Sequence, residues 1–454
     1  MDAISICKIL QQRGHEAYII GGAVRDQLLG LEPKDMDVVT SARPKEILKA
    51  FPGHKVSEVG KSFGVLLIDS IEVATFRQDR YAGFDDKAVE ISFADTLFED
   101  VSRRDLTINT MAMDPVSGEI TDHFNGREDL RNRIIRFVGN PMERIKEDPN
   151  RILRACRFAA KINGTLHHNT AVALRECSYF VKKYVAPERI SKEILAAMKV
   201  KNASTFFYLL HQIGVLKDIL PSLEGCFGHE HGNHHYEDIF SHMMMTGDHV
   251  STKNPLLKLA AYVHDVGKPA SFDPEGKTFY DHDQLGAEIL ATELPVLRFS
   301  NEEVTRICNL TRLHMTIHFK HPTPKSVRRV LKKLHEAGVS YRDLLRLYDA
   351  DLMGSLNRAH EHRNNRFGTL MAAYRVISPE LHRPEPVHSL ACLKINGNDV
   401  CRIAGIRPSK RVGEILDHLL EVVLEDPEMN NEEQLSSVVK ELVNKKNGFP
   451  PTRE

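Results

Sequence analysis

The hydrophobic periodicity of this chain changes near Pro141, and that change limits the possible folds more than any other feature of the sequence. Before it, short β-rich runs at 17–20, 65–68 and 71–76 alternate with helical runs such as 45–51. After it, apolar residues recur at helical spacing over nearly all of the remaining chain, as in RILRACRFAAKI. The pattern therefore predicts an α+β protein, with a small α/β head followed by a long all-helical body.

The composition permits several domains and argues against some classes of protein. With 454 residues, 42% of them hydrophobic, the chain can bury several cores. A net charge of −1 is not typical of a nucleic-acid-binding protein, although this average is compatible with a local basic surface. The N-terminus lacks a signal-peptide pattern, no apolar run is long enough to span a membrane, and the seven cysteines form no CxxC pair. We therefore expect a cytoplasmic protein without a membrane partner, and the sequence leaves its oligomeric state open.

Two aspartates, Asp35 and Asp37, follow a glycine pair and an arginine in the segment IIGGAVRDQLLGLEPKDMDVV. On a β-strand their side chains would share one face. Adjacent carboxylates are stable as anions only when cations bridge them, and Mg²⁺ prefers such oxygens and keeps positions open for phosphate. Gly22 would let a triphosphate approach the backbone, and Arg25 offers a donor fork suited to phosphate. The segment predicts a two-metal site for phosphoryl or nucleotidyl transfer.

Further motifs follow in order: RRDLTIN, then FNGREDL with IIR, then EDPNRILRACRFAA. Together with GGAVRD and KDMD, they resemble the motifs of the bacterial-type (class II) tRNA nucleotidyltransferase and poly(A) polymerase family across residues 15–220. The resemblance implies a polymerase-β-like head in which Asp35 and Asp37 are catalytic and hold two Mg²⁺ ions. Glu72 is a candidate third carboxylate, although an exposed strand glutamate is an equal alternative.

The resemblance also implies roles for the motifs after the aspartates. Arg104, Asp105 and Asn109 would contact the sugar and phosphates of the incoming nucleotide, unless Asp105 only caps a helix. The segment at 77–100 resembles the flexible loop with which family members change from C to A addition. Its length favours addition of the complete CCA sequence.

The EDPNR motif is expected to select the nucleotide. The resemblance implies that Asp148 and Arg151 project from one helix face and read the base edges of CTP and ATP without a nucleic-acid template. Residues at i and i+3 are neighbours on a helix, so an ordinary salt bridge is the alternative. An acceptor beside an arginine fork matches the amino group and ring nitrogen shared by cytosine and adenine. Arg154 and Arg157 continue the helix and are candidates for holding it or the phosphates.

A second group of motifs indicates another metal centre. The segments DIFSHMMMTGDH, LAAYVHDVGK, FYDHDQLGAEI, RLHMTIH and LYDADLMGS resemble the HD phosphohydrolase superfamily. Their mixed nitrogen and oxygen ligands suit a divalent transition metal. The resemblance implies phosphatase and 2′,3′-cyclic phosphodiesterase activity, with a scaffold role as the alternative. The implied core ligands are His242, His264, Asp265 and Asp351, and the additional ligands of two-metal members are His282 and His314.

These motifs divide the chain into four expected domains, with a polar, His-rich loop, GHEHGNHHYED, near the second boundary. The expected domains are a nucleotidyltransferase head at 1–139, a helical nucleotide-selecting and RNA-binding neck at 140–220, an HD domain at 221–375 and a helical tRNA-binding tail at 376–454.

The combined motifs predict an enzyme that adds or repairs CCA at tRNA 3′ ends from CTP and ATP and releases pyrophosphate. Two alternatives within the family are an A-adding tRNA nucleotidyltransferase and a poly(A) polymerase. The HD motifs and the near-neutral ending KKNGFPPTRE argue against the polymerase. An HD phosphohydrolase with an RNA-binding head is the alternative from another class, and the intact DMD and EDPNR motifs argue against it.

Overall fold

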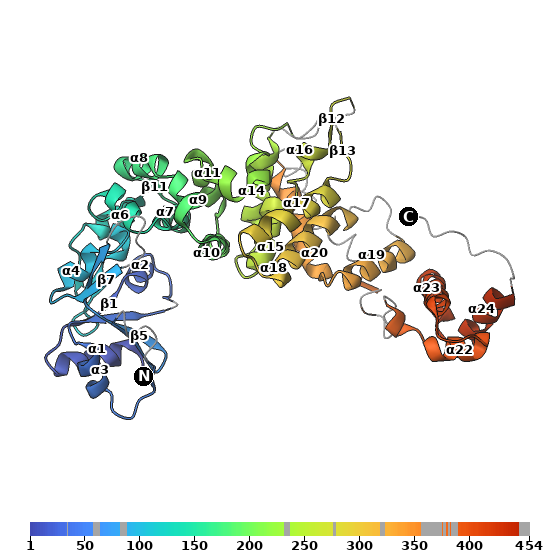
Figure 1. Ribbon diagram of the computed structural model, residues 1–454, viewed down its shortest axis with the longest axis horizontal. Coiled ribbons are helices and arrows are strands. Elements are labelled where there is room, and N and C mark those ends of the chain that lie inside the picture. Colours follow the sequence, from blue (N-terminus) through green and yellow to red (C-terminus); the bar gives the residue numbers. More distant parts are fainter. Residues whose placement is uncertain are drawn as a thin grey trace. The chain divides into compact units, whose positions relative to one another are not determined.

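The computed structural model describes most of the chain (Figure 1). Parts of the predicted flexible loop (82–88), the His-rich loop (231–236) and the chain ending (445–454) lie outside the described residues. The chain divides into two compact units, Met1–Glu224 and Gly225–Glu454. The described residues are 1–33, 35–57, 64–81, 89–230, 237–275, 278–317, 323–355, 375, 378–379, 382 and 389–444.

The first unit contains a mixed β-sheet with the strand order β3-β4-β5-β2-β1-β8-β9. β1 pairs antiparallel with β2 and with β8, whereas β2 pairs parallel with β5. The three predicted strands are confirmed as β1, β4 and β5, the last of them one residue shorter than expected. The strands of this sheet are β1 (Ala17–Ile20), β2 (Asp37–Thr40), β3 (Val56–Ser57), β4 (Val65–Ile68), β5 (Ile71–Thr75), β8 (Ala112–Met113) and β9 (Ile120–Thr121).

Smaller strand pairs and short helices complete the head. Apolar side chains of β1 and β2, such as Ile20 and Val39, form a core with Leu97 and Val101 of α4. The helices are α1 (Ala3–Gln12), α2 (Gly22–Leu28), α3 (Pro44–Ala50), α4 (Leu97–Ser102) and α5 (Gly126–Arg131), with a 3₁₀ turn, η2 (Thr107–Asn109). The additional strands are β6 (Arg77–Tyr81), antiparallel to β7 (Val89–Phe93), and β10 (Ile134–Ile135), parallel to β11 (Thr165–Leu166).

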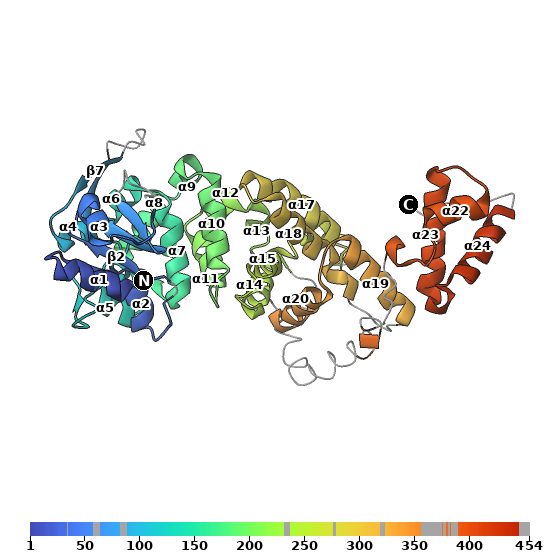
Figure 2. The same ribbon diagram turned by 90° about the horizontal axis from the view of Figure 1, so that it is seen from below.

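Helices dominate the rest of the first unit, as the periodicity predicts (Figure 2). α7 packs against both α10 and α11, and its buried face includes Ile152, Cys156 and Phe158. The helices of this neck are α6 (Pro141–Glu147), α7 (Arg151–Ile162), α8 (His168–Glu176), α9 (Tyr179–Tyr184), α10 (Pro187–Ala197), α11 (Ser204–Gln212), α12 (Leu216–Ile219) and α13 (Pro221–Glu224).

The second unit is helical apart from one short strand pair, β12 (Phe272–Asp273) with β13 (Thr278–Phe279), among its described residues. α14 packs on α15 and α20, and α18 packs on α15 and α17. These helices are α14 (Ile239–His249), α15 (Pro255–Val263), α16 (Lys268–Ser271), α17 (His282–Val296), α18 (Asn301–Leu313), α19 (Pro324–Glu336) and α20 (Tyr341–Gly354), with the 3₁₀ turn η3 (His314–Ile317).

A separate apolar cluster stabilises the C-terminal helices, with Val400, Ile415 and Leu435 fully or nearly fully buried. The elements are η4 (Leu390–Cys392), α22 (Gly397–Ala404), α23 (Lys410–Glu425), η5 (Pro427–Met429) and α24 (Glu432–Asn444). No helix among the described residues is long and apolar enough to cross a membrane. The α+β class is confirmed, because a mixed sheet is confined to the head and helices form the body.

Candidate active site and metal centre

The turn from β1 into α2 depends on Gly21, which precedes the first helical residue, Gly22. Gly21 has a φ of +70°, a conformation that favours glycine. A Cβ atom at this position would lie 3.2 Å from Nη1 of Arg104 and 3.4 Å from the backbone oxygen of Asn109. Gly21 therefore lets the chain turn close to the RRDLTIN motif. Of the glycine pair that the sequence indicated, Gly21 is the one whose backbone conformation requires glycine.

Asp37 is the first residue of β2, and Asp35 lies in the preceding loop. The expectation that both share one strand face is therefore wrong, because the pairing with β1 begins only where Ile20 lies opposite Asp37. The two carboxylates nevertheless interact. Burial raises the pKa of Asp37, Arg104 opposes this shift, and the charge of Asp35 adds to it.

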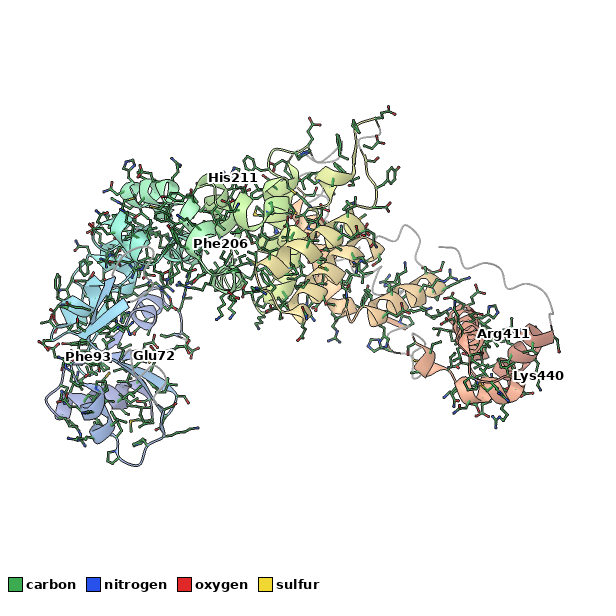
Figure 3. All side chains as sticks on the ribbon, viewed as in Figure 1. Glu72, Phe93, Phe206, His211, Arg411 and Lys440 are labelled. Carbon is green, nitrogen blue, oxygen red and sulfur yellow. The ribbon has the colours of Figure 1, made fainter. Side chains whose placement is uncertain are left out.

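Glu72 lies beside Asp37 in the sheet. β2 and β5 run parallel with Val38 opposite Val73, so the residues that precede these two occupy neighbouring positions. Glu72 is an exposed residue of β5, as the alternative reading of a strand glutamate expected (Figure 3), and partial desolvation together with the charge of Asp37 raises its pKa. A cation bound beside such carboxylates would stabilise their charged forms. The chemistry of these oxygen donors is compatible with a divalent cation.

Buried polar side chains connect α2, η2 and α7. Nη1 of Arg25 donates to Oδ1 of Asn109 (2.5 Å), and Nδ2 of Asn109 donates to Oδ1 of Asp105 (3.1 Å). Nε of Arg154 donates to Oδ2 of Asp105 (2.7 Å). Arg25 also bonds Asp26 through Nε and Nη2, so much of its donor fork is already engaged. The network fixes these residues on one wall of the site.

Asp105 stabilises the head in a pH-dependent way. Burial alone would raise its pKa, but Arg154, Asn109 and the amide of Leu106 outweigh burial and lower it below its ordinary value of 3.8. Because the folded pKa is depressed, this stabilisation is present above the unfolded pKa and is lost as pH falls through the folded pKa.

Asp105→Asn is expected to lower the free energy of unfolding by about 2 kcal/mol at pH 7, because Arg154 loses a charged partner. The difference from the wild type should shrink below about pH 4, where a protonated aspartic acid resembles asparagine. Denaturation of both proteins between pH 3 and 7 measures this. A difference that stays constant over that range would contradict the role assigned to Asp105.

The two central residues of EDPNR do not lie on one helix face, and that expectation is wrong. α6 ends at Glu147, Asp148 has extended backbone angles (φ −148°, ψ 99°), and α7 begins at Arg151. The cause is Pro149, because the residue before a proline is driven out of the helical region. Both side chains still line the same cavity.

Each of these two residues has an oppositely charged partner of its own. Nη1 and Nη2 of Arg189 donate to the two carboxylate oxygens of Asp148, at 2.9 and 2.7 Å. Nη1 of Arg151 donates to Oε2 of Glu147 (2.6 Å), and its Nη2 donates to the backbone oxygen of Arg103 (3.0 Å). Asp148 and Arg151 therefore bond to other residues, and the alternative of a simple salt bridge between them is wrong.

Three arginines of the cavity lie against the same aromatic ring. The guanidinium carbons of Arg25, Arg154 and Arg157 lie 4.8, 5.5 and 4.3 Å from the ring centre of Phe158. Nε of Arg157 also donates to Oε2 of Glu193 on α10 (2.5 Å). Stacking on the ring holds these positive groups close together despite their repulsion, which favours an anionic ligand.

The cavity measures about 690 Å³, a size suited to a nucleotide. Of the residues predicted for the head site, Asp35 and the candidate Glu72 do not line it, and the others do: Gly22, Arg25, Asp37, Arg104, Asp105, Asn109, Asp148, Arg151, Arg154 and Arg157. Gly21 of the predicted glycine pair lines the cavity as well. Sequence reasoning missed further lining residues, namely Arg77, Asp79, Arg103, Asn150, Phe158, Lys161, Arg189, Lys192 and Glu193.

The second unit brings the predicted HD residues together from separate helices. Each residue except Asp351 is at least nine-tenths buried by overall exposure, and Asp351 is half-buried. Two groups offer ligand atoms within 4.8 Å of one another, and Asp265 belongs to both. The first group is His242, His264 and Asp265, and the second is Asp265, His282 and His314.

Asp351 joins the first group. Its Oδ1 lies 2.8 Å from Nε2 of His242 and 3.5 Å from Nε2 of His264. Oδ1 of Asp265 lies 3.3 Å from Nε2 of His282 and 3.6 Å from Nε2 of His314. All six predicted residues thus converge around Asp265.

Backbone carbonyls orient three of the histidines in the same way. Nδ1 of His264, His282 and His314 lies 2.9, 2.7 and 2.6 Å from the carbonyl oxygen of the residue three positions earlier. A carbonyl accepts only from N–H, so Nδ1 carries a proton and Nε2 is the nitrogen that faces the carboxylates of the cluster. This is the orientation found in metal-binding histidines.

The charges of the HD cluster also suit a cation. Burial raises the pKa of Asp351, but His242 and His264 outweigh it and hold the pKa well below its usual range. Burial lowers the pKa of His264, yet Asp265 and Asp351 raise it to about 10. Burial and the charge of His264 lower the pKa of His314 to about 3. The anionic Asp351 and the neutral His314 are donors that suit a divalent metal, whereas His264 would release its proton on binding one.

Three domain families match the chain. The poly A polymerase head domain matches residues 17–136, the probable RNA and SrmB-binding site of polymerase A matches 165–226, and the HD domain matches 234–341. The first match falls in the first unit, the second ends two residues beyond it, and the third falls in the second unit. Domains of the first and third kinds imply the use of divalent metals, and the second unit holds the two His/Asp groups that could bind one.

Similar proteins extend over much of the chain. A multifunctional CCA protein of Legionella pneumophila is 33% identical over 320 residues, which are 67% of this chain and 75% of that protein. An A-adding tRNA nucleotidyltransferase of Deinococcus radiodurans is 28% identical over 419 residues, or 89% of this chain and 91% of that protein. The crystal structure of the Bacillus stearothermophilus CCA-adding enzyme in complex with CTP has a TM-score of 0.69 at 24% identity, covering 97% of both chains. This chain therefore belongs to the bacterial-type (class II) family of CCA-adding tRNA nucleotidyltransferases and poly(A) polymerases, and it carries an HD domain in the same polypeptide.

Proposed function

We propose that this nucleotidyltransferase adds or repairs the complete CCA sequence at tRNA 3′ ends, using CTP and ATP. The observation that supports this most is the position of Asp148 and Arg151 in the cavity that Asp37 also lines. A carboxylate acceptor and a guanidinium donor there match the amino group and ring nitrogen of cytosine and adenine.

In the proposed reaction, the 3′-oxygen of the RNA bonds to the α-phosphorus of the nucleotide, and the bond to the β-phosphate oxygen breaks. Arg104, Asn109 and the arginines stacked on Phe158 bind the triphosphate and sugar. Arg154 is held for this task by Asp105 (Nη2 to Oδ2, 2.6 Å). Positioning and charge stabilisation by such groups account for most of the catalysis in phosphoryl transfer.

Asp35 and Asp37 are proposed to hold two Mg²⁺ ions, with Glu72 as a third carboxylate. When bound, these ions lower the pKa of the 3′-hydroxyl and offset the charge of the triphosphate and the leaving pyrophosphate. Hard carboxylate oxygens favour magnesium over softer metals.

The HD centre is proposed to hydrolyse phosphate esters at RNA ends, including 2′,3′-cyclic phosphates, with a divalent transition metal. His242, His264, Asp265 and Asp351 would bind the metal, and His282 with His314 would complete a second position. A blocked 3′ end must become a free hydroxyl before a nucleotide can be added, which gives the two centres related substrates.

We also propose the domain division 1–139, 140–220, 221–375 and 376–454, with tRNA binding in the neck and tail. The unit boundary at Glu224 and the three domain matches support it. All seven cysteines carry free thiols, which supports a cytoplasmic location.

The experiment that tests the function supplies tRNA without CCA, tRNA ending in C and tRNA ending in CC. Each receives CTP and ATP separately and together, and products are separated by length. We expect completion to CCA on all three tRNAs when both nucleotides are present. Long A tails would instead indicate a poly(A) polymerase.

An A-adding enzyme is the second candidate, because the Deinococcus relative of that name aligns with 89% of this chain. It would incorporate only ATP, and only onto tRNA ending in CC. The same set of reactions therefore separates the two candidates.

A further inference from the structure

We propose that Arg189 is a positioning residue that makes Asp148 selective for bases carrying an exocyclic amino group. The inference rests on the proposed nucleotide addition and goes beyond it, because it assigns part of the nucleotide selectivity to α10. Arg189 lies 41 positions after Asp148, and both side chains line the cavity.

Asp148 depends on a contact from another element to fix the direction of its side chain. Its backbone is extended and lies between α6 and α7, so no helix fixes the direction of its side chain. Arg189 reaches it from α10 with two parallel hydrogen bonds, one to each carboxylate oxygen (2.9 and 2.7 Å). Such a bidentate pair fixes the plane of the carboxylate as well as its position.

The Asp148 carboxylate has a limited number of positions at which it can accept a hydrogen bond. An ionised carboxylate accepts about four hydrogen bonds, two on each oxygen. Oδ1 accepts from Arg189 and from the backbone N–H of Asn150 (3.1 Å), and Oδ2 accepts from Arg189 alone among the described residues. One acceptor position, on Oδ2, therefore remains for a ligand.

The four bases differ in the group that their edges would present to this acceptor position. The remaining position can only accept, so it matches the amino group of cytosine or adenine. Uracil and guanine place a carbonyl oxygen at the corresponding position, where it would face the carboxylate oxygen without a proton between them. Without Arg189, the carboxylate can turn, and a turned carboxylate no longer directs an oxygen acceptor at the base edge and so tolerates a carbonyl.

Arg189 is itself held in place by the helix that carries it. α10 begins at Pro187, and its buried face includes Ile190 and Ile194. Glu193, one turn after Arg189, bonds both Arg157 and Asn150 (2.5 and 3.1 Å). α10 is thus tied to the start and the middle of α7, the helix that carries Arg151.

The test measures kcat/KM of the full-length protein for CTP, UTP, ATP and GTP on the appropriate tRNA ends. We expect Arg189→Ala to lower the CTP:UTP and ATP:GTP ratios by roughly 10-fold or more, the size expected when a charge-assisted hydrogen bond is lost. Arg189→Lys keeps the charge but cannot bond both oxygens in one plane, so its ratios should fall by less.

Lys199→Ala is the matched control, because it removes one exposed positive charge just after α10 and away from the cavity. It should leave both ratios unchanged. If Arg189→Ala slows all four nucleotides equally, or leaves the ratios unchanged, Arg189 has only a structural role and the proposal fails. Should Arg189→Ala unfold, the ratios of Arg189→Lys decide. A wild type that adds neither C nor A would instead overturn the proposed function.

Discussion

Asp37→Asn is expected to lower the rate of CTP and ATP incorporation into tRNA by about 10³-fold or more. Asparagine keeps the shape of the side chain but removes the negative charge that holds a cation beside the reacting phosphate. Desolvation and the charge of Asp35 raise the pKa of Asp37, so a bound cation would stabilise its carboxylate. The measurement is single-turnover incorporation at saturating nucleotide.

Glu32→Gln is the matched control for this variant. Glu32 is an exposed acidic residue between α2 and β2, and it does not line the cavity. The control should keep wild-type incorporation, and both variants should keep the thermal midpoint of the wild type. Asp37→Asn activity within about 10-fold of the wild type would show that Asp37 is not a metal-binding carboxylate.

His264→Ala is expected to reduce hydrolysis of 2′,3′-cyclic AMP by about 10²-fold or more and to lower the metal content of the purified protein. His264 is 1% exposed, and its Nε2 lies within 3.5 Å of both Asp265 and Asp351. Removing it takes a nitrogen ligand from the first group of the HD cluster. Incorporation of CTP and ATP should remain unchanged, because the nucleotide cavity is lined only by residues of the first unit.

His249→Ala serves as the control for this variant. His249 also has Nδ1 hydrogen-bonded to a backbone carbonyl, that of Met245 (2.8 Å), but its side chain is exposed at the end of α14. It should keep metal content and hydrolysis. Wild-type turnover of 2′,3′-cyclic AMP by His264→Ala would contradict a catalytic HD centre and favour a scaffold role.

The sequence was informative about the HD centre because each of its residues lies in a recognisable local motif. His242, His282 and Asp351 lie on α14, α17 and α20, whereas His264 and Asp265 follow the end of α15 and His314 begins η3, and the six nevertheless come together. What the sequence could not show is the shared role of Asp265 and the carbonyls that orient the imidazoles. Those contacts depend on where each helix ends, and helix ends are the least certain feature of a sequence-based prediction.

The errors in the head have identifiable physical causes. Pro149 explains why Asp148 lies outside the helix, since the residue before a proline avoids helical angles. The strand start at Asp37 is set by pairing with β1, which is a property of the sheet and not of the local sequence. No local pattern marked Arg189 or Glu193, because their importance comes from partners on other elements.

By itself, the sequence determined which chemical groups this protein has and their order: carboxylates and arginines in an α/β head, then histidines and aspartates in helices. Only the tertiary structure decided which charge pairs with which. Asp148 pairs with Arg189 rather than with Arg151, three residues away. The physical reason is that a charge-assisted hydrogen bond requires atoms within about 3 Å in the correct direction, and packing between distant helices sets both.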